Sequence, residues 1–110
     1  IQYNIAILRP GMTLKEFAEK AYTQPPGHRR YSCVSHAVGM SDEYPKVTFI
    51  DQWDVKGTDC TFEPGMVMCI ESYIGKESGG EGVKLEEQVL LLEDGNEVMT
   101  SFPYEDKLLN

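Results

Sequence analysis

The chain has 110 residues, enough for one domain or for one lobe of a larger one. Hydrophobic residues make up 41% and can form a core, whereas a formal net charge of -8 argues against nucleic acid or an anionic membrane as main partner. No stretch approaches the roughly 18 apolar residues that span a bilayer, and none has the pattern of a signal peptide. We therefore expect a cytoplasmic protein.

The first residues and the cysteines refine this expectation. Ile1 is not a natural initiator, so the chain reads as beginning in mid-sequence, with residues missing before it. The cysteines are odd in number and widely spaced, without a CxxC pair, which argues against a zinc finger or a disulfide framework. Cys33 and Cys69 lie in apolar runs, where a cysteine usually packs as a small buried hydrophobe.

The first half of the chain predicts one clear helix. Thr13 and Glu16 match a capping box, and apolar residues follow at helical spacing to about Tyr22. Two prolines and a glycine at 25–27 end this helix. A basic cluster at 28–30 is expected to face solvent. We then predict a strand over 31–38, a loop over 39–45, a short strand over 47–50 and a loop over 51–59.

The second half predicts strands joined by turns. Turns are expected at 63–65 and 94–95, a flexible glycine-rich segment at 76–82, and strands over 66–73, 83–92 and 97–100. Together the elements predict an α+β fold, in which a largely antiparallel sheet carries at least one helix.

Three polar residues interrupt the predicted strands. His36 lies in a small apolar run, Glu71 ends a continuous apolar run, and Glu86 lies in a β-favouring strand. A buried carboxylate needs a cation, a metal or several hydrogen-bond donors. A divalent metal would satisfy two carboxylates and a histidine. Each residue also has a purely structural interpretation, as a core histidine, a glutamate at a strand end, and a glutamate alternating across an edge strand.

The surrounding residues resemble the M24 metallopeptidase family. The similarity lies in residues 35–39 followed by Glu43-Tyr44-Pro45, in the run 62–71 around Pro64-Gly65-Met66-Val67, and in the strand 82–90. The turn and helix start at 9–13 also match what precedes the histidine segment in that family. These motifs occur in the family's order and cover nearly the whole chain.

The resemblance implies a pita-bread fold, with residues 1–110 as the C-terminal half of one catalytic domain and its curved, mostly antiparallel sheet. His36, Glu71 and Glu86 would be metal ligands, with Glu86 bridging two divalent ions of iron, manganese, zinc or cobalt. Two aspartate ligands would come from the N-terminal half, which is not in this chain. The fragment alone is therefore expected to be inactive.

Departures from the peptidase pattern favour another reaction. Where peptidases usually have a substrate-contacting histidine, this chain has Asp42, a poor partner for an oxyanion but a suitable general base. Ser72-Tyr73 replaces the usual Pro-Gly after Glu71. Residues 31–36 and 71–73 resemble the dimethylsulfoniopropionate lyases of the DddP type. Asp42 is then the candidate base, and Tyr31 and Tyr73 the substrate-binding aromatics, with Trp53 as a further candidate.

Other functions stay open at this point. An Xaa-Pro peptidase, prolidase or creatinase-like hydrolase would need a histidine donor, and His28 is poorly placed for that role. A non-enzymatic pita-bread binding module usually loses its metal ligands, whereas the ligands in this chain are kept. Asp42 also suits the capping of a loop, and the tyrosines suit a plain sheet. The lyase resemblance further implies a small-molecule substrate and a homodimer.

Overall fold

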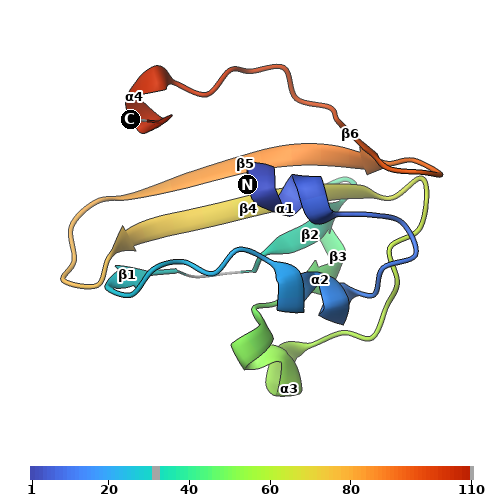
Figure 1. Ribbon diagram of the computed structural model, residues 1–110, viewed down its shortest axis with the longest axis horizontal. Helices are drawn as coiled ribbons and strands as arrows, with labels where there is room; N and C mark the ends of the chain where they lie inside the picture. The colour runs from blue at the N-terminus through green and yellow to red at the C-terminus, as the bar shows by residue number, and fades with distance from the viewer. Residues whose placement is uncertain (31–32, 110) are drawn as a thin grey trace.

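The computed structural model describes residues 1–30 and 33–109, and within them a single antiparallel sheet dominates (Figure 1). The strand order is β3-β2-β4-β5-β6, and β1 also pairs with β4. The elements in chain order are α1 (Gln2–Ile7), α2 (Leu14–Lys20), β1 (His28–Arg29), β2 (Ser35–Val38), β3 (Asp42–Val47), the 3₁₀ turn η1 (Ile50–Gln52), α3 (Trp53–Lys56), β4 (Val67–Lys76), β5 (Gly82–Leu91), β6 (Asn96–Val98) and α4 (Asp106–Leu109).

Strands β4 and β5 are the two longest strands and form the central hairpin of the sheet. Its register runs continuously from Val67 opposite Leu90 to Gly75 opposite Gly82. Gly79 and Gly80 turn the chain with φ values of 96° and 93°, a region that only glycine enters readily. Both strands are confirmed, and β4 extends beyond the predicted 66–73 because pairing with β5 continues to the glycine turn.

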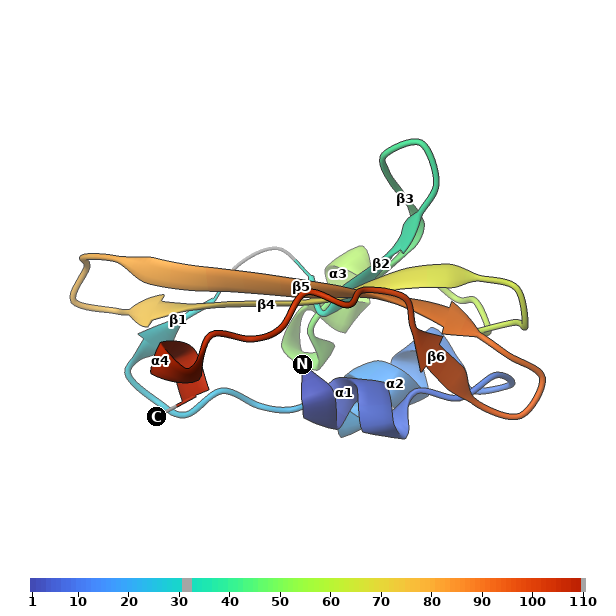
Figure 2. The ribbon, with the colours of Figure 1, turned by 90° about the horizontal axis from the view of Figure 1, so that it is seen from above.

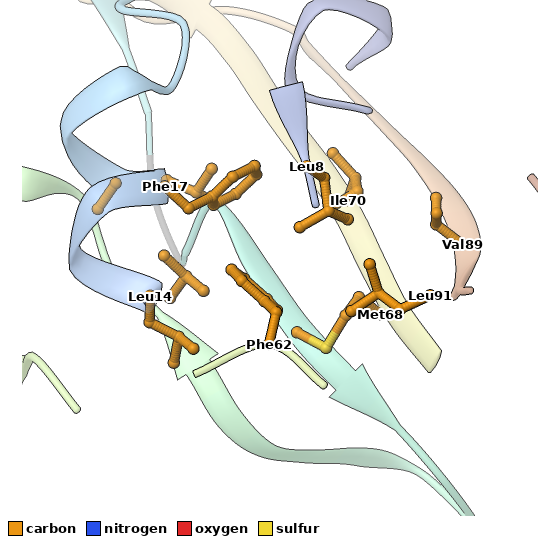
Figure 3. Packing of buried hydrophobic residues seen from close by; sticks show 11 residues of the cluster. Leu8, Leu14, Phe17, Phe62, Met68, Ile70, Val89 and Leu91 are labelled. Atoms are coloured by element: carbon orange, nitrogen blue, oxygen red, sulfur yellow. The ribbon is translucent and has the colours of Figure 1, made fainter. Parts of the chain in front are cut away.

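The two faces of the sheet differ in what covers them. Helices α1 and α2 lie on one side of the sheet, and the β2–β3 hairpin rises from the other (Figure 2). Because side chains alternate along a strand, Met68 and Ile70 face the helices, whereas Cys69 and Glu71 face away from them. In Figure 3, side chains from α2, β4 and β5 converge into one core, with Phe17 edge-on to Phe62. The fully buried members are Leu8, Leu14, Phe17, Val47, Phe62, Met68, Ile70 and Val89.

Helix α2 begins as the sequence predicts. The Thr13 hydroxyl accepts from the Glu16 backbone N–H at 3.1 Å, and the Glu16 carboxylate accepts from the Thr13 N–H at 2.8 Å. These hydrogen bonds hold the pKa of Glu16 below its usual range. The helix ends at Lys20, two residues earlier than predicted.

Replacing Thr13 with alanine is expected to lower the free energy of unfolding of the intact protein by about 1 kcal/mol, because the hydroxyl that accepts from the Glu16 N–H is lost. Urea denaturation measures the change. Thr23→Ala, in an exposed loop, is the matched control and should leave stability within about 0.5 kcal/mol. Equal effects of the two substitutions would show that the capping box contributes nothing.

Several predicted elements between residues 31 and 59 are wrong, in whole or in part. The expected loop 39–45 is largely strand, because pairing with β2 orders Asp42–Val47; Pro45 fits there because β3 is an edge strand. The expected strand 47–50 and loop 51–59 contain η1 and α3 instead. In the predicted strand 31–38 only Ser35–Val38 is strand, and residues 31–32 lie outside the described part.

Helix α1 has no counterpart in the prediction. It is short, and no side chain caps its start, so the sequence gives no boundary signal. Tertiary contacts hold it instead: Asn96 Nδ2 donates to the carbonyls of Ile5 and Leu8, both at 2.9 Å. None of the helices in the described part is both long enough and apolar enough to cross a bilayer.

Candidate metal centre

His36 is held on the inner strand β2, between β3 and β4. It lies opposite Lys46 on one side and opposite Cys69 on the other, and it is only 5% exposed. Its Nδ1 is 2.9 Å from the carbonyl oxygen of Ala37. Since a carbonyl can only accept, Nδ1 carries the hydrogen, and the Nε2 lone pair is left for a metal. This is the orientation that a metal-binding histidine needs.

The two glutamates lie directly opposite each other on β4 and β5. Glu71 is buried, at 5% exposure, whereas the side chain of Glu86 is 39% exposed. One Glu71 oxygen, Oε1, accepts from the Cys33 thiol at 2.9 Å and lies 3.4 Å from the Cys33 backbone nitrogen. The register of the hairpin therefore brings together two carboxylates that are far apart in the sequence.

Lys84 places a positive charge between these carboxylates. Its Nζ is 2.9 Å from Glu71 Oε2 and also forms an ion pair with Glu86. Hydrogen bonds to Glu86 first and Glu71 second raise the pKa of Lys84, so the ammonium stays charged at neutral pH. The paired carboxylates thus need a cation, and a His-plus-carboxylate donor set fits a divalent metal.

Cys69 lies on the same face, two residues before Glu71 on β4. Its thiol donates to Glu86 Oε2 at 3.3 Å, and it lies opposite His36. Burial first, and then the hydrogen bond to Glu86, raise the pKa of the Cys69 thiol, which is therefore protonated at neutral pH. Ligand atoms of His36, Cys69 and Glu86 all lie within 4.8 Å of one another.

The structure places Asp42 beside His36, whereas the Tyr73 ring lies beside Gly82 and Arg29. Asp42 Oδ1 is 3.8 Å from His36 Nε2, with its side chain 73% exposed. Tyr73 lies on the same face of the sheet as Glu71, but its ring extends toward Gly82. The ring is so close that a methyl group at position 82 would lie 2.4 Å from the tyrosine oxygen. The Arg29 guanidinium already faces that ring at 5.7 Å. Tyr31 lies outside the described residues.

Trp53 does not join the group around His36. It begins α3 and packs against the edge of the hydrophobic core. Three residues that the sequence analysis did not predict as site residues also contact the candidate ligands: Cys33, Cys69 and Lys84. Strand alternation signals the last two, because each precedes a ligand glutamate by two positions and so shares its face.

Lys84→Met is expected to destabilise the metal-free intact protein by about 1–3 kcal/mol, less than a fully buried pair would lose because Lys84 is 41% exposed. The reason is that the buried Glu71 carboxylate loses the ammonium beside it. Thermal unfolding in chelator and then with added Mn²⁺ measures the effect, and the metal should restore most of the loss. Lys76→Met, at the exposed end of β4, is the control. A variant as stable as the control in chelator would contradict the prediction.

A hollow of ≈ 350 Å³ adjoins the site. Cys33 forms part of its wall and also contacts Glu71, so the hollow and the candidate site share this residue. Its positive charges suit an anionic group. The lining residues are Cys33, Tyr44, Lys46, Thr48, Lys56 and Thr58.

Comparison with known proteins identifies the family. The profile of metallopeptidase family M24 matches residues 1–93. The chain belongs to this family. Over 99% of its length it is 38% identical to the dimethylsulfoniopropionate lyase DddP of Roseovarius nubinhibens and 35% identical to that of Roseobacter denitrificans. It spans only a quarter of the length of either of these M24 relatives.

Solved structures confirm the expected pita-bread fold of this M24 chain. Prolidase from Pyrococcus furiosus superimposes with a TM-score of 0.72 at 25% identity, covering 94% of this chain and 30% of the prolidase. The Xaa-Pro dipeptidase of Bacillus anthracis gives 0.71 at 26% identity, with 94% and 28% covered. Enzymes of the family are metal-dependent peptidases or lyases.

Proposed function

We propose that residues 1–110 are the C-terminal half of an M24 catalytic domain that binds two divalent metal ions. His36, Glu71 and Glu86 would be this half's ligands, with Glu86 between the two ions and two aspartates supplied by the preceding half. The convergence of the three side chains on one sheet face supports this assignment. The chain spans only a quarter of the length of its M24 relatives, which supports a larger catalytic domain. We also propose that the intact enzyme is a homodimer.

We infer that the whole enzyme is a lyase that cleaves dimethylsulfoniopropionate to dimethyl sulfide and acrylate. The observation that carries this inference is Asp42, a carboxylate 3.8 Å from the metal-competent nitrogen of His36. A carboxylate at this place repels an oxyanion but can accept a proton. The identity with two relatives named as such lyases points the same way.

The proposed reaction is a β-elimination. Bound divalent ions would supply Lewis acidity at the substrate carboxylate. Asp42 takes the proton from the carbon next to that carboxylate, and the C–H electron pair becomes the new carbon–carbon double bond. The carbon–sulfur bond breaks, and dimethyl sulfide leaves with its electron pair. Because the Asp42 side chain is 73% exposed, it can then pass the proton to water.

The charges near the site suit a substrate with one anionic and one cationic end. Lys46 and Lys56 line the hollow beside Cys33 and favour the carboxylate end. Tyr31 and Tyr73 remain the candidates for the sulfonium end, since aromatic faces attract onium groups. The Arg29 guanidinium lies 5.7 Å from the centre of the Tyr73 ring, a contact of the same cation–ring kind.

The decisive experiment assays the intact protein on two substrates, dimethylsulfoniopropionate and an Xaa-Pro dipeptide. Release of dimethyl sulfide and acrylate, with no proline release, is the expected result. Turnover of the dipeptide without dimethyl sulfide would reject the lyase in favour of a peptidase. Metal analysis of the same sample completes the test, because full stability in chelator and no bound metal would instead indicate a binding module.

A further inference from the structure

We propose that the metal centre has a second binding mode, in which one thiophilic divalent ion such as Cd²⁺ or Zn²⁺ is held by His36 Nε2, the Cys69 thiolate and a Glu86 oxygen. This inference goes beyond the proposed lyase function, because it adds a sulfur ligand that the reaction does not use. It concerns which metals the centre captures.

Three adjacent strands position the three ligands. His36 on β2 lies opposite Cys69 on β4, and the Cys69 thiol reaches Glu86 on β5 at 3.3 Å. His36 is 5% exposed and Cys69 is 3% exposed, so the nitrogen and the sulfur are shielded from water. The Ala37 carbonyl fixes the imidazole with Nε2 available. These ligands therefore need no change in the fold to bind one ion.

The spacing is close to that of a metal site. Tetrahedral zinc bonds of about 2.0–2.3 Å place neighbouring ligand atoms about 3.6 Å apart. The ligand atoms of His36, Cys69 and Glu86 all lie within 4.8 Å of one another. Side-chain movements of about 1 Å bring the ligand atoms to the spacing of a tetrahedral site. Water can then occupy the fourth position.

The chemical softness of the metal ion determines which of the two binding modes it adopts. Oxygen-rich ligand sets suit hard ions, whereas a thiolate selects thiophilic ones. Glu71 is held by Cys33 and Lys84 in this structure, so a soft ion gains more from the sulfur of Cys69 than from displacing those contacts. On binding, the thiol proton passes to solvent and a sulfur–metal bond forms, with no change of oxidation state. The hydrogen bond from Cys69 to Glu86 is replaced by shared coordination.

The test titrates the metal-free intact protein with Cd²⁺ and follows thiolate-to-cadmium charge transfer in the ultraviolet. One equivalent of Cd²⁺ is expected to give the full charge-transfer band. Cys69→Ser should abolish it and weaken Cd²⁺ binding at least about tenfold, whereas Mn²⁺ binding should change less than about threefold. Cys60→Ser is the matched control, because its thiol contacts the Thr61 carbonyl on another part of the surface and should keep the band.

A full band in Cys69→Ser, or its loss in Cys33→Ser instead, would overturn the proposal. Circular dichroism checks that each variant is folded. Should Cys69→Ser unfold, alkylation of the wild-type protein with and without Cd²⁺, followed by peptide mapping, gives the same answer: Cd²⁺ must protect Cys69 specifically. A cadmium band in a protein that releases no dimethyl sulfide would reject the lyase function and leave this second mode standing.

Discussion

Asp42→Asn is expected to lower kcat for dimethylsulfoniopropionate cleavage by about 10²–10⁴-fold, the usual contribution of a general base. The amide has the size of the carboxylate but cannot take the proton. Metal content should stay unchanged, because the Asp42 side chain is 73% exposed and only approaches His36 at 3.8 Å. Steady-state release of dimethyl sulfide and metal analysis of the same preparation measure both quantities.

The control for this prediction is Glu43→Gln, which removes the neighbouring charge on β3. Glu43 lies opposite Ala37 in an exposed part of the edge strand, so its removal should change kcat less than about twofold. A fall in bound metal that matches the fall in rate would reassign Asp42 from base to ligand. An unchanged rate would remove it from the reaction altogether.

His36→Ala is expected to weaken metal binding by at least about 100-fold and to abolish turnover, because it removes a ligand and not merely an outer contact. Metal content after dialysis against dilute chelator measures the first effect. His28→Ala is the matched control, since it replaces the chain's other histidine, on β1, and should retain full metal content. Full occupancy in His36→Ala would show that the ion is bound elsewhere.

The parts of the candidate site that depend on local sequence could be predicted. A histidine and two glutamates inside β-favouring runs mark the candidate ligands, and the flanking motifs indicate the family. The sequence does not predict that Glu71 and Glu86 lie directly opposite each other, because this depends on where the 76–82 turn closes and hence on the hairpin register. Strand alternation places Lys84 on the face of Glu86, but its contact with Glu71 also depends on this register.

The fold was predictable where periodicity and turn residues agree. Strands β4 and β5 and helix α2 follow from continuous apolar runs, glycines and a capping box. Strand β3 was predicted as loop because Asp42 and Pro45 favour turns locally, and only pairing with β2 overrides them. Helix α1 was missed because contacts with Asn96, far along the chain, hold its end.

The ammonium of Lys84 between two acidic side chains also affects how the protein matures. A sheet that carries its own counter-ion can fold before any metal is supplied, since the Lys84 ammonium offsets part of the repulsion between its two carboxylates. Metal loading is then an exchange of one positive charge for others, not a condition for folding. If the proposed site binds metal, its carboxylates exchange the Lys84 contact for the ion after the sheet has formed.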